Sequence, residues 1–221
     1  MAPTLWLEPD LAVDLGMLNA STVHIIDPDC NTADRVRTLL APQEVVVLHY
    51  CTIEKFRLGN PGDRPACVVM ELALEDEDPN RFIAEMRQQP CPLPILILSA
   101  QATVRRAVDA MVAGAAFVLE KPGDNAVLKR LIQGALHRDA ESVRHCAEAR
   151  QISSRLKTLS PREREVSELI FQGLETKVIA SRLGISPKTV EYHRAQIFAK
   201  MDVSNAVQLT VAMLRLERAG K

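Results

Sequence analysis

Short apolar runs alternate with helical patterns over roughly the first two thirds of the chain. The runs are β-branched or aliphatic on both faces and cover residues 23–26, 45–48, 67–70, 95–98 and 117–119. Helical spacing of apolar positions lies between them, at Thr32–Leu40, Thr52–Arg57, Asn80–Gln88, Thr103–Ala113 and from Asn125 onward. Strands that are apolar on both faces need helices on both sides of a sheet. Residues 21–137 are therefore predicted to form an α/β domain with a five-stranded, parallel, doubly wound sheet.

The pattern changes near residue 158, beyond which every predicted element is helical. Ser160, Pro161 and Glu163 predict a helix start, because serine caps the first turn and the glutamate reaches back to the cap. Further helices are predicted from Thr176, after Ser186 and over Ala206–Leu216. Two helices joined by a short glycine-containing turn are typical of a helix-turn-helix. Residues 158–221 are thus predicted to form an all-α, four-helix domain.

Two segments lie outside these domains. Residues 1–20 are interpreted as an N-terminal extension, whose apolar Leu5, Trp6 and Leu7 would pack on a neighbouring surface. The helical pattern that starts at Asn125 keeps its apolar stripe only to about His137, so residues 138–157 are predicted to be a helical linker. Too few heptads hold apolar positions there to support a coiled coil.

Charge is distributed unevenly between the two predicted domains. Residues 150–221 contain 13 Lys and Arg against 7 Asp and Glu, whereas residues 1–149 contain 14 against 21. A basic terminal domain suits the phosphate backbone of a nucleic acid, although chance solvated charge would give the same numbers.

Several classes of protein are disfavoured by the composition. The most continuous apolar run, Leu93–Ala100, is shorter than the ~20 residues of a membrane helix, and no secretory signal is evident. Five cysteines without a Cys-x-x-Cys pair favour reduced thiols over a zinc knuckle or a disulfide scaffold. No catalytic triad, glycine-rich phosphate loop or metal-spaced cluster is evident. We therefore expect a cytoplasmic protein that is not an enzyme and uses no membrane, metal or cofactor.

Polar donors gather near the start of the helix that follows Ser186. A recognition helix places such donors in the major groove, while the preceding helix crosses the DNA backbone. Lys188 and Arg194 could meet phosphates or guanine edges. Thr176, Lys177 and Arg182, on the preceding helix, would suit phosphates. Ordinary surface charge on a small helical bundle is the alternative interpretation of these residues.

The same region resembles the LuxR-type (GerE) DNA-binding domain over residues 156–215. The resemblance rests on Leu159–Val166, Gly173-Leu174, Lys177–Ala180, Leu183–Ser186 and Lys188–Arg194. It implies that the third helix reads the major groove and that the fourth pairs two monomers. The expected DNA-contacting residues are Thr176, Lys177, Arg182, Lys188, Thr189, Val190, Tyr192, His193 and Arg194. The expected dimer face consists of Val203, Ala206, Leu209 and Met213. Glu175-Thr176 departs from the Ser-Asn or Pro-Asn that is common in the family.

The first domain resembles a response-regulator receiver, which has a flavodoxin-like fold, and the whole chain resembles the FixJ/NarL class. The resemblance rests on the strand alternation and on Asp27, Glu71, Ser99 and Lys121-Pro122 at strand ends. Receivers accept a phosphoryl group on an aspartate after the third strand. Acids after the first strand hold a magnesium ion, and a hydroxyl and a lysine bind the phosphoryl oxygens.

The predicted pocket departs from the receiver pattern at two positions. Glu71 stands in place of the acceptor aspartate, and Pro28 replaces the second acid, with Asp29 one place late. The extra methylene of glutamate moves the carboxylate out of line for phosphoryl transfer. We predict that Glu71 is not phosphorylated and that Asp27, Asp29, Glu71, Ser99 and Lys121 form a degenerate pocket. The Glu71 carboxylate could instead reach Lys121 and Ser99 and hold a phosphate-free state.

The sequence therefore predicts a sequence-specific transcription regulator that works without receiver phosphorylation. It would bind an inverted repeat in double-stranded DNA as a homodimer, with RNA polymerase or another regulatory protein as further candidate partners. Three alternatives stay open. The pocket could be a structural cluster only, a displaced acceptor such as Asp29, Asp76 or Asp78 could restore a conventional phosphorylation switch, or the chain could sequester a partner regulator.

Overall fold

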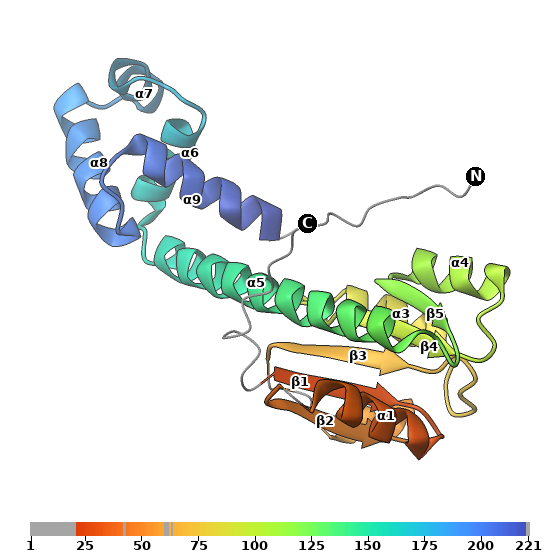
Figure 1. The fold of residues 1–221 in the computed structure, drawn as a ribbon. Helices are drawn as coiled ribbons and strands as arrows, with labels where there is room; N and C mark the ends of the chain where they lie inside the picture. Colours follow the sequence, from red (N-terminus) through yellow and green to blue (C-terminus); the bar gives the residue numbers. More distant parts are fainter. Residues whose placement is uncertain (1–20, 42, 60–61, 63, 220–221) are drawn as a thin grey trace, which may run out of the picture. The chain divides into compact units, whose positions relative to one another are not determined.

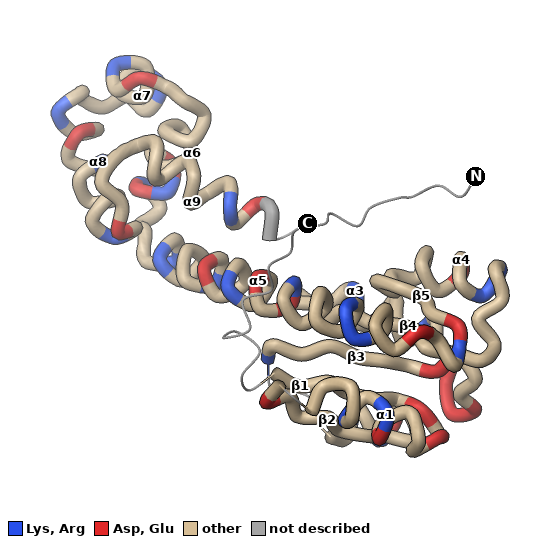
Figure 2. The backbone as a smooth tube through the Cα atoms, in the orientation of Figure 1, with Lys and Arg blue, Asp and Glu red and all other residues tan. Residues whose placement is uncertain are grey.

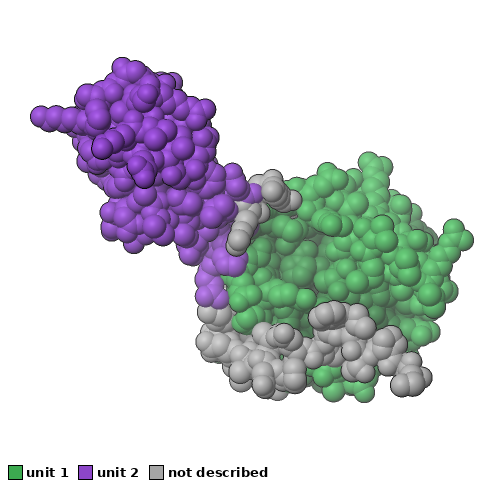
Figure 3. All heavy atoms as spheres, turned by 90° about the horizontal axis from the view of Figure 1, so that it is seen from above, with its two compact units in different colours: residues 1–143 green, residues 144–221 purple. Residues whose placement is uncertain are grey.

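The protein is represented by a computed structural model, which describes residues 21–219 except 42, 60–61 and 63. The predicted extension, residues 1–20, lies outside the described residues. The chain divides after Val143 into two compact units, which are coloured separately in Figure 3.

A parallel sheet forms the centre of the first unit (Figure 1). Its strands are β1 (Ser21–Ile26), β2 (Val45–Tyr50), β3 (Ala66–Met70), β4 (Ile95–Ser99) and β5 (Phe117–Glu120), in the order β2-β1-β3-β4-β5. The helices are α1 (Cys30–Leu40), α2 (Ile53–Leu58), α3 (Pro79–Arg87), α4 (Val104–Ala113) and the start of α5 (Asn125–Lys157). The prediction of a five-stranded parallel sheet with intervening helices is confirmed.

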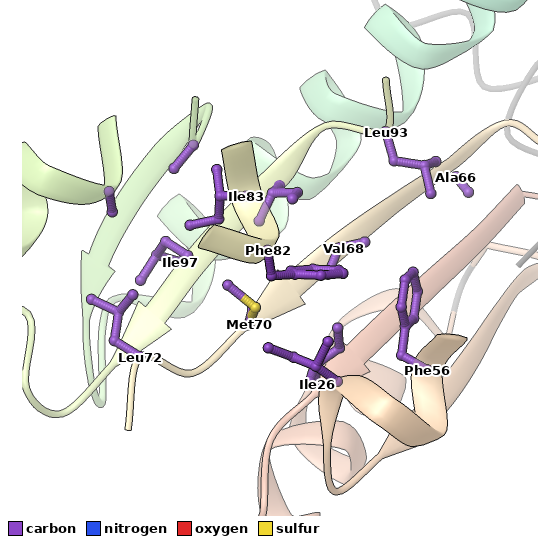
Figure 4. Close-up of a cluster of buried hydrophobic side chains, with 14 residues drawn as sticks. Ile26, Phe56, Ala66, Val68, Met70, Leu72, Phe82, Ile83, Leu93 and Ile97 are labelled. Carbon is purple, nitrogen blue, oxygen red and sulfur yellow. The ribbon is translucent and has the colours of Figure 1, made fainter. Parts of the chain in front are cut away.

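Helices cover both faces of the sheet, which is why the strands are apolar on both faces. On one face, Val23 and Val69 pack against residues of α1 and α5. On the other, Met70 lies in a cluster with Phe56 of α2 and Phe82 of α3 (Figure 4). Strands β1, β3 and β4 are buried along their whole lengths. Because register is fixed where both faces are buried, the strand ends are held in fixed positions.

Helix α5 includes the predicted linker, but the structure divides that linker between the two units. Asp139 is 1% exposed in the first unit, where its carboxylate binds the Arg64 guanidinium and accepts a hydrogen bond from the Ala66 amide at 2.8 Å. Ile152, in contrast, belongs to the apolar core of the second unit. Residues 138–157 thus belong to one continuous helix, and its two ends contribute to different cores.

The second unit adds four helices: α6 (Pro161–Phe171), α7 (Thr176–Leu183), α8 (Pro187–Met201) and α9 (Ala206–Ala219). The predicted capping box between Ser160 and Glu163 is present, and the Glu163 carboxylate also binds Lys200 Nζ of α8 at 2.6 Å. Gly184 ends α7 with a left-handed φ of 65°, and Ser186 caps α8. A tight turn therefore joins α7 and α8, as the helix-turn-helix pattern predicts.

The composition led us to expect no membrane-spanning helix and reduced cysteine thiols. None of the described helices is long and apolar enough to cross a membrane. Cys30, Cys51 and Cys67 are free thiols. Cys91 and Cys146 are disulfide-bonded, so the expectation of reduced thiols is wrong for these two residues.

Candidate functional site

A buried charged cluster occupies the carboxyl edge of the sheet. Asp27 follows β1, Glu71 follows β3, Ser99 ends β4 and Lys121 follows β5. The carboxyl ends of parallel strands meet at one edge, so these side chains converge. Lys121 Nζ lies 2.6 Å from Asp27 Oδ2 and 2.9 Å from Glu71 Oε2. Asp27 and Glu71 are only 2% and 6% exposed, so the two ion pairs are largely shielded from water.

The Glu71 carboxylate is hydrogen-bonded at both oxygens. Oε1 accepts from the Ser99 hydroxyl and from the amides of Leu72 (2.7 Å) and Ala73 (3.1 Å). Oε2 accepts from Lys121 and, at 3.4 Å, from the Ala100 amide. The structure thus shows the two contacts that the sequence suggested for this carboxylate, with Lys121 and with Ser99. The backbone amides add to them and were not predicted.

The surroundings of this cluster favour its charged form. Burial alone would raise the pKa of Glu71, but the hydrogen bonds from Ser99 and Lys121 outweigh it and leave the pKa below its ordinary value. Burial alone would lower the pKa of Lys121, but Asp27 and Glu71 raise it above its ordinary value. Glu71 and Lys121 therefore form an ion pair across the neutral pH range.

Asp29 does not join the cluster, contrary to the predicted pocket. Its side chain caps α1 and accepts hydrogen bonds from the amide and side chain of Asn31, at 3.0 and 2.7 Å. An aspartate directly before a helix is a preferred cap, which is the physical reason for the difference. Thr32, which was not predicted, takes a place in the pocket, because its hydroxyl donates to Asp27 Oδ2 at 2.7 Å.

The pocket does not fit a magnesium ion. Magnesium requires several oxygen ligands in octahedral geometry. Asp27 Oδ2 already accepts from Lys121 and Thr32, Oδ1 accepts from the Asp29 amide, and Pro28 offers no side-chain ligand. The Lys121 ammonium stands between the two carboxylates and would repel a divalent cation. Among the described residues, no group of three or more His, Cys, Asp or Glu side chains could hold a metal ion.

Four consecutive acidic residues, Glu75–Asp78, lie in the segment between β3 and α3, and two of them form hydrogen bonds with helix starts. Asp76 accepts a hydrogen bond from the Glu54 amide at 3.1 Å, at the start of α2. Asp78 caps α3 and accepts from the Asn80 amide at 3.0 Å. Neither residue contacts the Glu71 cluster within the described part of the chain. These contacts favour a structural role for the two residues over that of a displaced phosphoacceptor.

Arg35 of α1 holds the loop that carries Lys121, a role that sequence reasoning missed. Its guanidinium donates to the carbonyls of Pro122 and Gly123 and to the Asn125 side chain, the last at 2.6 and 2.8 Å. Because Pro122 and Gly123 directly follow Lys121 in this loop, Arg35 fixes the position from which the ammonium reaches Asp27 and Glu71.

Replacing Arg35 by alanine is expected to lower the free energy of unfolding by about 1–3 kcal/mol, because several hydrogen bonds from a charged donor are lost. Urea denaturation checks this result. Arg37→Ala is the matched control, since Arg37 lies on the same helix and, among the described residues, pairs only with the exposed Asp34 and, weakly, the Val47 carbonyl. A loss in R35A no larger than in R37A would contradict the role of Arg35 as a clamp.

The second unit exposes four of the nine residues predicted to contact DNA. Lys177 and Arg182 on α7, and Lys188 and Tyr192 on α8, are exposed, and Tyr192 is 63% exposed. Lys and Arg are found on α7 and at the start of α8, whereas Asp and Glu gather near the strand ends of the first unit (Figure 2). Helices α7 and α8 thus present basic side chains in the arrangement that a helix-turn-helix uses.

Thr176, His193 and Arg194 are half-buried and partly engaged within the unit. The Thr176 hydroxyl donates to Glu191 at 2.6 Å, and Arg194 lies 3.7 Å from Glu191 and over the ring of Phe198. Thr189 is half-buried too, and its amide donates to the Ser186 cap at 3.0 Å. Contact with DNA would require Thr176 and Arg194 to share or exchange their Glu191 partner.

Two predicted interface residues are instead core residues. Val190 and Leu209 are both 0% exposed and lie in the apolar core of the second unit. Val190, Ile197 and Met201 are seven and four residues apart, which places them on one inward face of α8. Val203, Ala206 and Met213 are half-buried against the same core. Among the α9 residues whose side chains the structure describes, the large aliphatic residues that are exposed are Val207, Val211 and Leu214.

Both units match known families. The family described as "Response regulator receiver domain" matches residues 23–133, and "Bacterial regulatory proteins, luxR family" matches residues 157–213. The transcriptional regulatory protein FixJ of Bradyrhizobium diazoefficiens is 32% identical over 199 residues, which cover 90% of this chain and 97% of that protein. FixJ of Azorhizobium caulinodans is 32% identical over 188 residues, or 85% and 89% of the two chains.

Solved structures give the same assignment. The response regulator StyR superposes with a TM-score of 0.73 at 26% identity, covering 89% of this chain and 99% of that one. Full-length FixJ from B. japonicum superposes with a TM-score of 0.52 at 31% identity, covering 90% and 98%. The relatives are transcription regulators rather than enzymes. The chain therefore belongs to the FixJ-like response regulators, and it is a transcription regulator with a receiver domain and a LuxR-type DNA-binding domain.

Proposed function

We propose that this regulator binds its operator without phosphorylation of the receiver. The observation that carries the proposal is the Glu71 carboxylate, which is bound by Ser99 and Lys121 within the protein itself. By resemblance to receivers, a hydroxyl and a lysine at these positions would hold the phosphoryl oxygens. In this chain the Glu71 carboxylate already binds both the Ser99 hydroxyl and the Lys121 ammonium.

The charge balance of the pocket supports the same proposal. Two buried carboxylates already neutralise the Lys121 ammonium. An incoming phosphoryl group would add negative charge to this site with no magnesium ion to offset it, and two like charges at close range are strongly unfavourable in a buried site. Glu71 thus supplies a permanent negative partner for Ser99 and Lys121, which is the partner that a phosphoryl group supplies transiently in a receiver.

The proposed DNA target is an inverted repeat that is read by two copies of the chain. Half-sites about one helical turn apart follow from the geometry of dimeric helix-turn-helix proteins. Affinity should fall steeply with salt, because phosphate contacts dominate such complexes. RNA polymerase or another regulatory protein is a further candidate partner at the promoter.

Selection of genomic fragments by the purified, untreated protein tests this function. Footprinting of the recovered fragments should show two protected half-sites related by inversion. If the untreated chain recovers no specific fragment, DNA binding on its own is excluded. Co-purification with a second regulator would then favour the alternative in which the chain sequesters a partner.

The apolar surfaces that remain exposed support a homodimer. On α9, Val207, Val211 and Leu214 are 72%, 43% and 41% exposed and are spaced four and three residues apart, so they form one stripe. On α4, the exposed residues Val104, Val108, Met111 and Val112 lie on one face. We propose that a second copy covers the α9 stripe when both copies are bound to DNA and the α4 face when two receivers pair. This α9 stripe replaces the dimer face expected from the sequence.

Val211→Glu is expected to abolish the complex with two half-sites while leaving binding to a single half-site unchanged, because a charge would be buried between the two copies of α9. Gel-shift assays with one-site and two-site DNA measure both. Leu58→Glu is the control, since Leu58 is 78% exposed on α2, a helix that belongs to neither proposed surface. Normal two-site binding by V211E would exclude the α9 stripe as the contact.

A further inference from the structure

A hollow of about 420 Å³ lies at the amino-terminal edge of the receiver sheet, at the opposite end of the strands from the Glu71 cluster. Its lining comes from α3, the residues before β4, the end of α4 and α5. Apolar side chains, including Ile83, Leu93, Ile95 and Met111, contribute much of the surface. The volume is within the range of about 300–1,000 Å³ that is typical of small-molecule sites.

Two arginines without an acidic partner line this hollow. Arg87 of α3 and Arg138 of α5 are both exposed, and among the described residues neither forms an ion pair. Arg138 lies over the ring of Phe117, 4.9 Å from its centroid. The Arg87 side chain lies against Gly114, where an added β-carbon would stand 2.7 Å from Arg87 Cδ. Both guanidinium groups are therefore placed by packing while their charges stay unpaired.

The one acid in the lining does not neutralise these arginines. Asp139 is fully engaged by the Arg64 guanidinium and by the Ala66 amide. Arg87 makes one long hydrogen bond, of 3.4 Å, to the Val112 carbonyl. The hollow consequently combines apolar lining residues with the guanidinium groups of Arg87 and Arg138, which are free to bind a ligand. Guanidinium groups bind carboxylates through paired hydrogen bonds.

We propose that this hollow binds a small amphipathic anion, in which a carboxylate is attached to a short apolar body. The carboxylate would bind Arg87 and Arg138, and the apolar body would cover Ile83, Leu93 and Ile95. Arg138 and Ser142 belong to α5, the helix that continues into the DNA-binding unit. A ligand here would therefore contact the helix common to both units and give this regulator an input that does not involve the Glu71 pocket.

Calorimetric titration of the full-length protein with octanoate tests the proposal, with the neutral octanol as a comparison. We expect saturable binding of one octanoate per chain, at least tenfold tighter than octanol. Arg87→Gln and Arg138→Gln should each weaken octanoate binding about tenfold, because each removes a charged hydrogen-bond donor. Arg81→Gln is the matched control, since Arg81 is exposed on α3 but does not line the hollow.

Three results would overturn the proposal. These are no saturable binding up to millimolar octanoate, equal binding of octanol and octanoate, and unchanged binding in the double variant R87Q/R138Q with an unchanged melting temperature. Because the assay contains neither DNA nor a phosphodonor, its failure is distinct from failure of the proposed function. A change in operator affinity on adding octanoate, absent in the double variant, would support the assignment of the site as an input.

Discussion

Replacing Glu71 by glutamine is expected to lower the free energy of unfolding by about 2–4 kcal/mol, because the buried carboxylate is lost and the half-buried Lys121 ammonium keeps only one of its two partners. Glutamine retains the size of the side chain and an oxygen that can accept from Ser99 and the nearby amides. Its NH₂ group, however, would face Lys121, and two donors cannot satisfy each other. Urea denaturation of both proteins at pH 7 measures the loss.

The pH dependence of that loss identifies its cause. The lowered pKa of Glu71 means that its contribution to stability is present above the unfolded value of about 4.3 and disappears as pH falls through the lower folded value. The raised pKa of Lys121 means that its contribution is present below about 10.4 and disappears as pH rises through the higher folded value. The difference between wild type and E71Q should therefore be constant between about pH 5 and 10 and shrink outside that window.

Glu120→Gln provides the control for this experiment, since Glu120 is an exposed acid at the end of β5, directly before Lys121. It should change stability by less than about 0.5 kcal/mol. A difference between wild type and E71Q that persists unchanged into strong acid would show that the cluster contributes through packing and not through charge.

Lys188→Ala is expected to weaken operator binding about 5- to 150-fold, which corresponds to about 1–3 kcal/mol for a base or phosphate contact. Lys188 is fully available for such a contact, since it is exposed near the start of α8 and, among the described residues, forms no ion pair. The salt dependence separates the two kinds of contact. If Lys188 binds a phosphate, the slope of log affinity against log salt should become shallower by about one.

Arg164→Ala removes the same charge from an exposed position on α6, outside the helix-turn-helix. Its operator affinity should stay close to that of the wild type, and circular dichroism should show that both variants keep the fold. Equal loss of affinity in K188A and R164A would mean that net charge alone attracts the DNA. Unchanged affinity in K188A would exclude α8 as the recognition helix.

The fold and the central pocket were predictable because their signals are local or follow from topology. Each strand is a short apolar run, and the parallel arrangement brings strand ends that are distant in sequence to one edge of the sheet. The sequence alone therefore places Asp27, Glu71, Ser99 and Lys121 together. Arg35 could not be placed with them, because its partner Asn125 lies 90 residues away and an arginine on a polar helix face carries no distinguishing pattern.

The differences at Asp29, Val190 and Leu209 have specific physical reasons. Asp29 directly precedes α1, and its side chain caps that helix instead of joining the pocket. For Val190 the apolar spacing along α8 predicts burial, whereas resemblance to the family suggests contact with DNA, and the structure follows the spacing. Leu209 is buried by contacts between helices of the second unit, which the pattern along α9 alone does not reveal.

The most direct test of phosphate-independent action compares DNA binding and oligomeric mass of the untreated protein with and without magnesium and acetyl phosphate. Mass spectrometry of the intact chain is recorded on the same samples. We predict a dimer that binds the operator before treatment, no added phosphoryl mass, and unchanged affinity afterwards. Binding that appears only after treatment, together with an added phosphoryl group, would contradict the proposed role of the Glu71–Lys121 pair and would require the modified residue to be mapped.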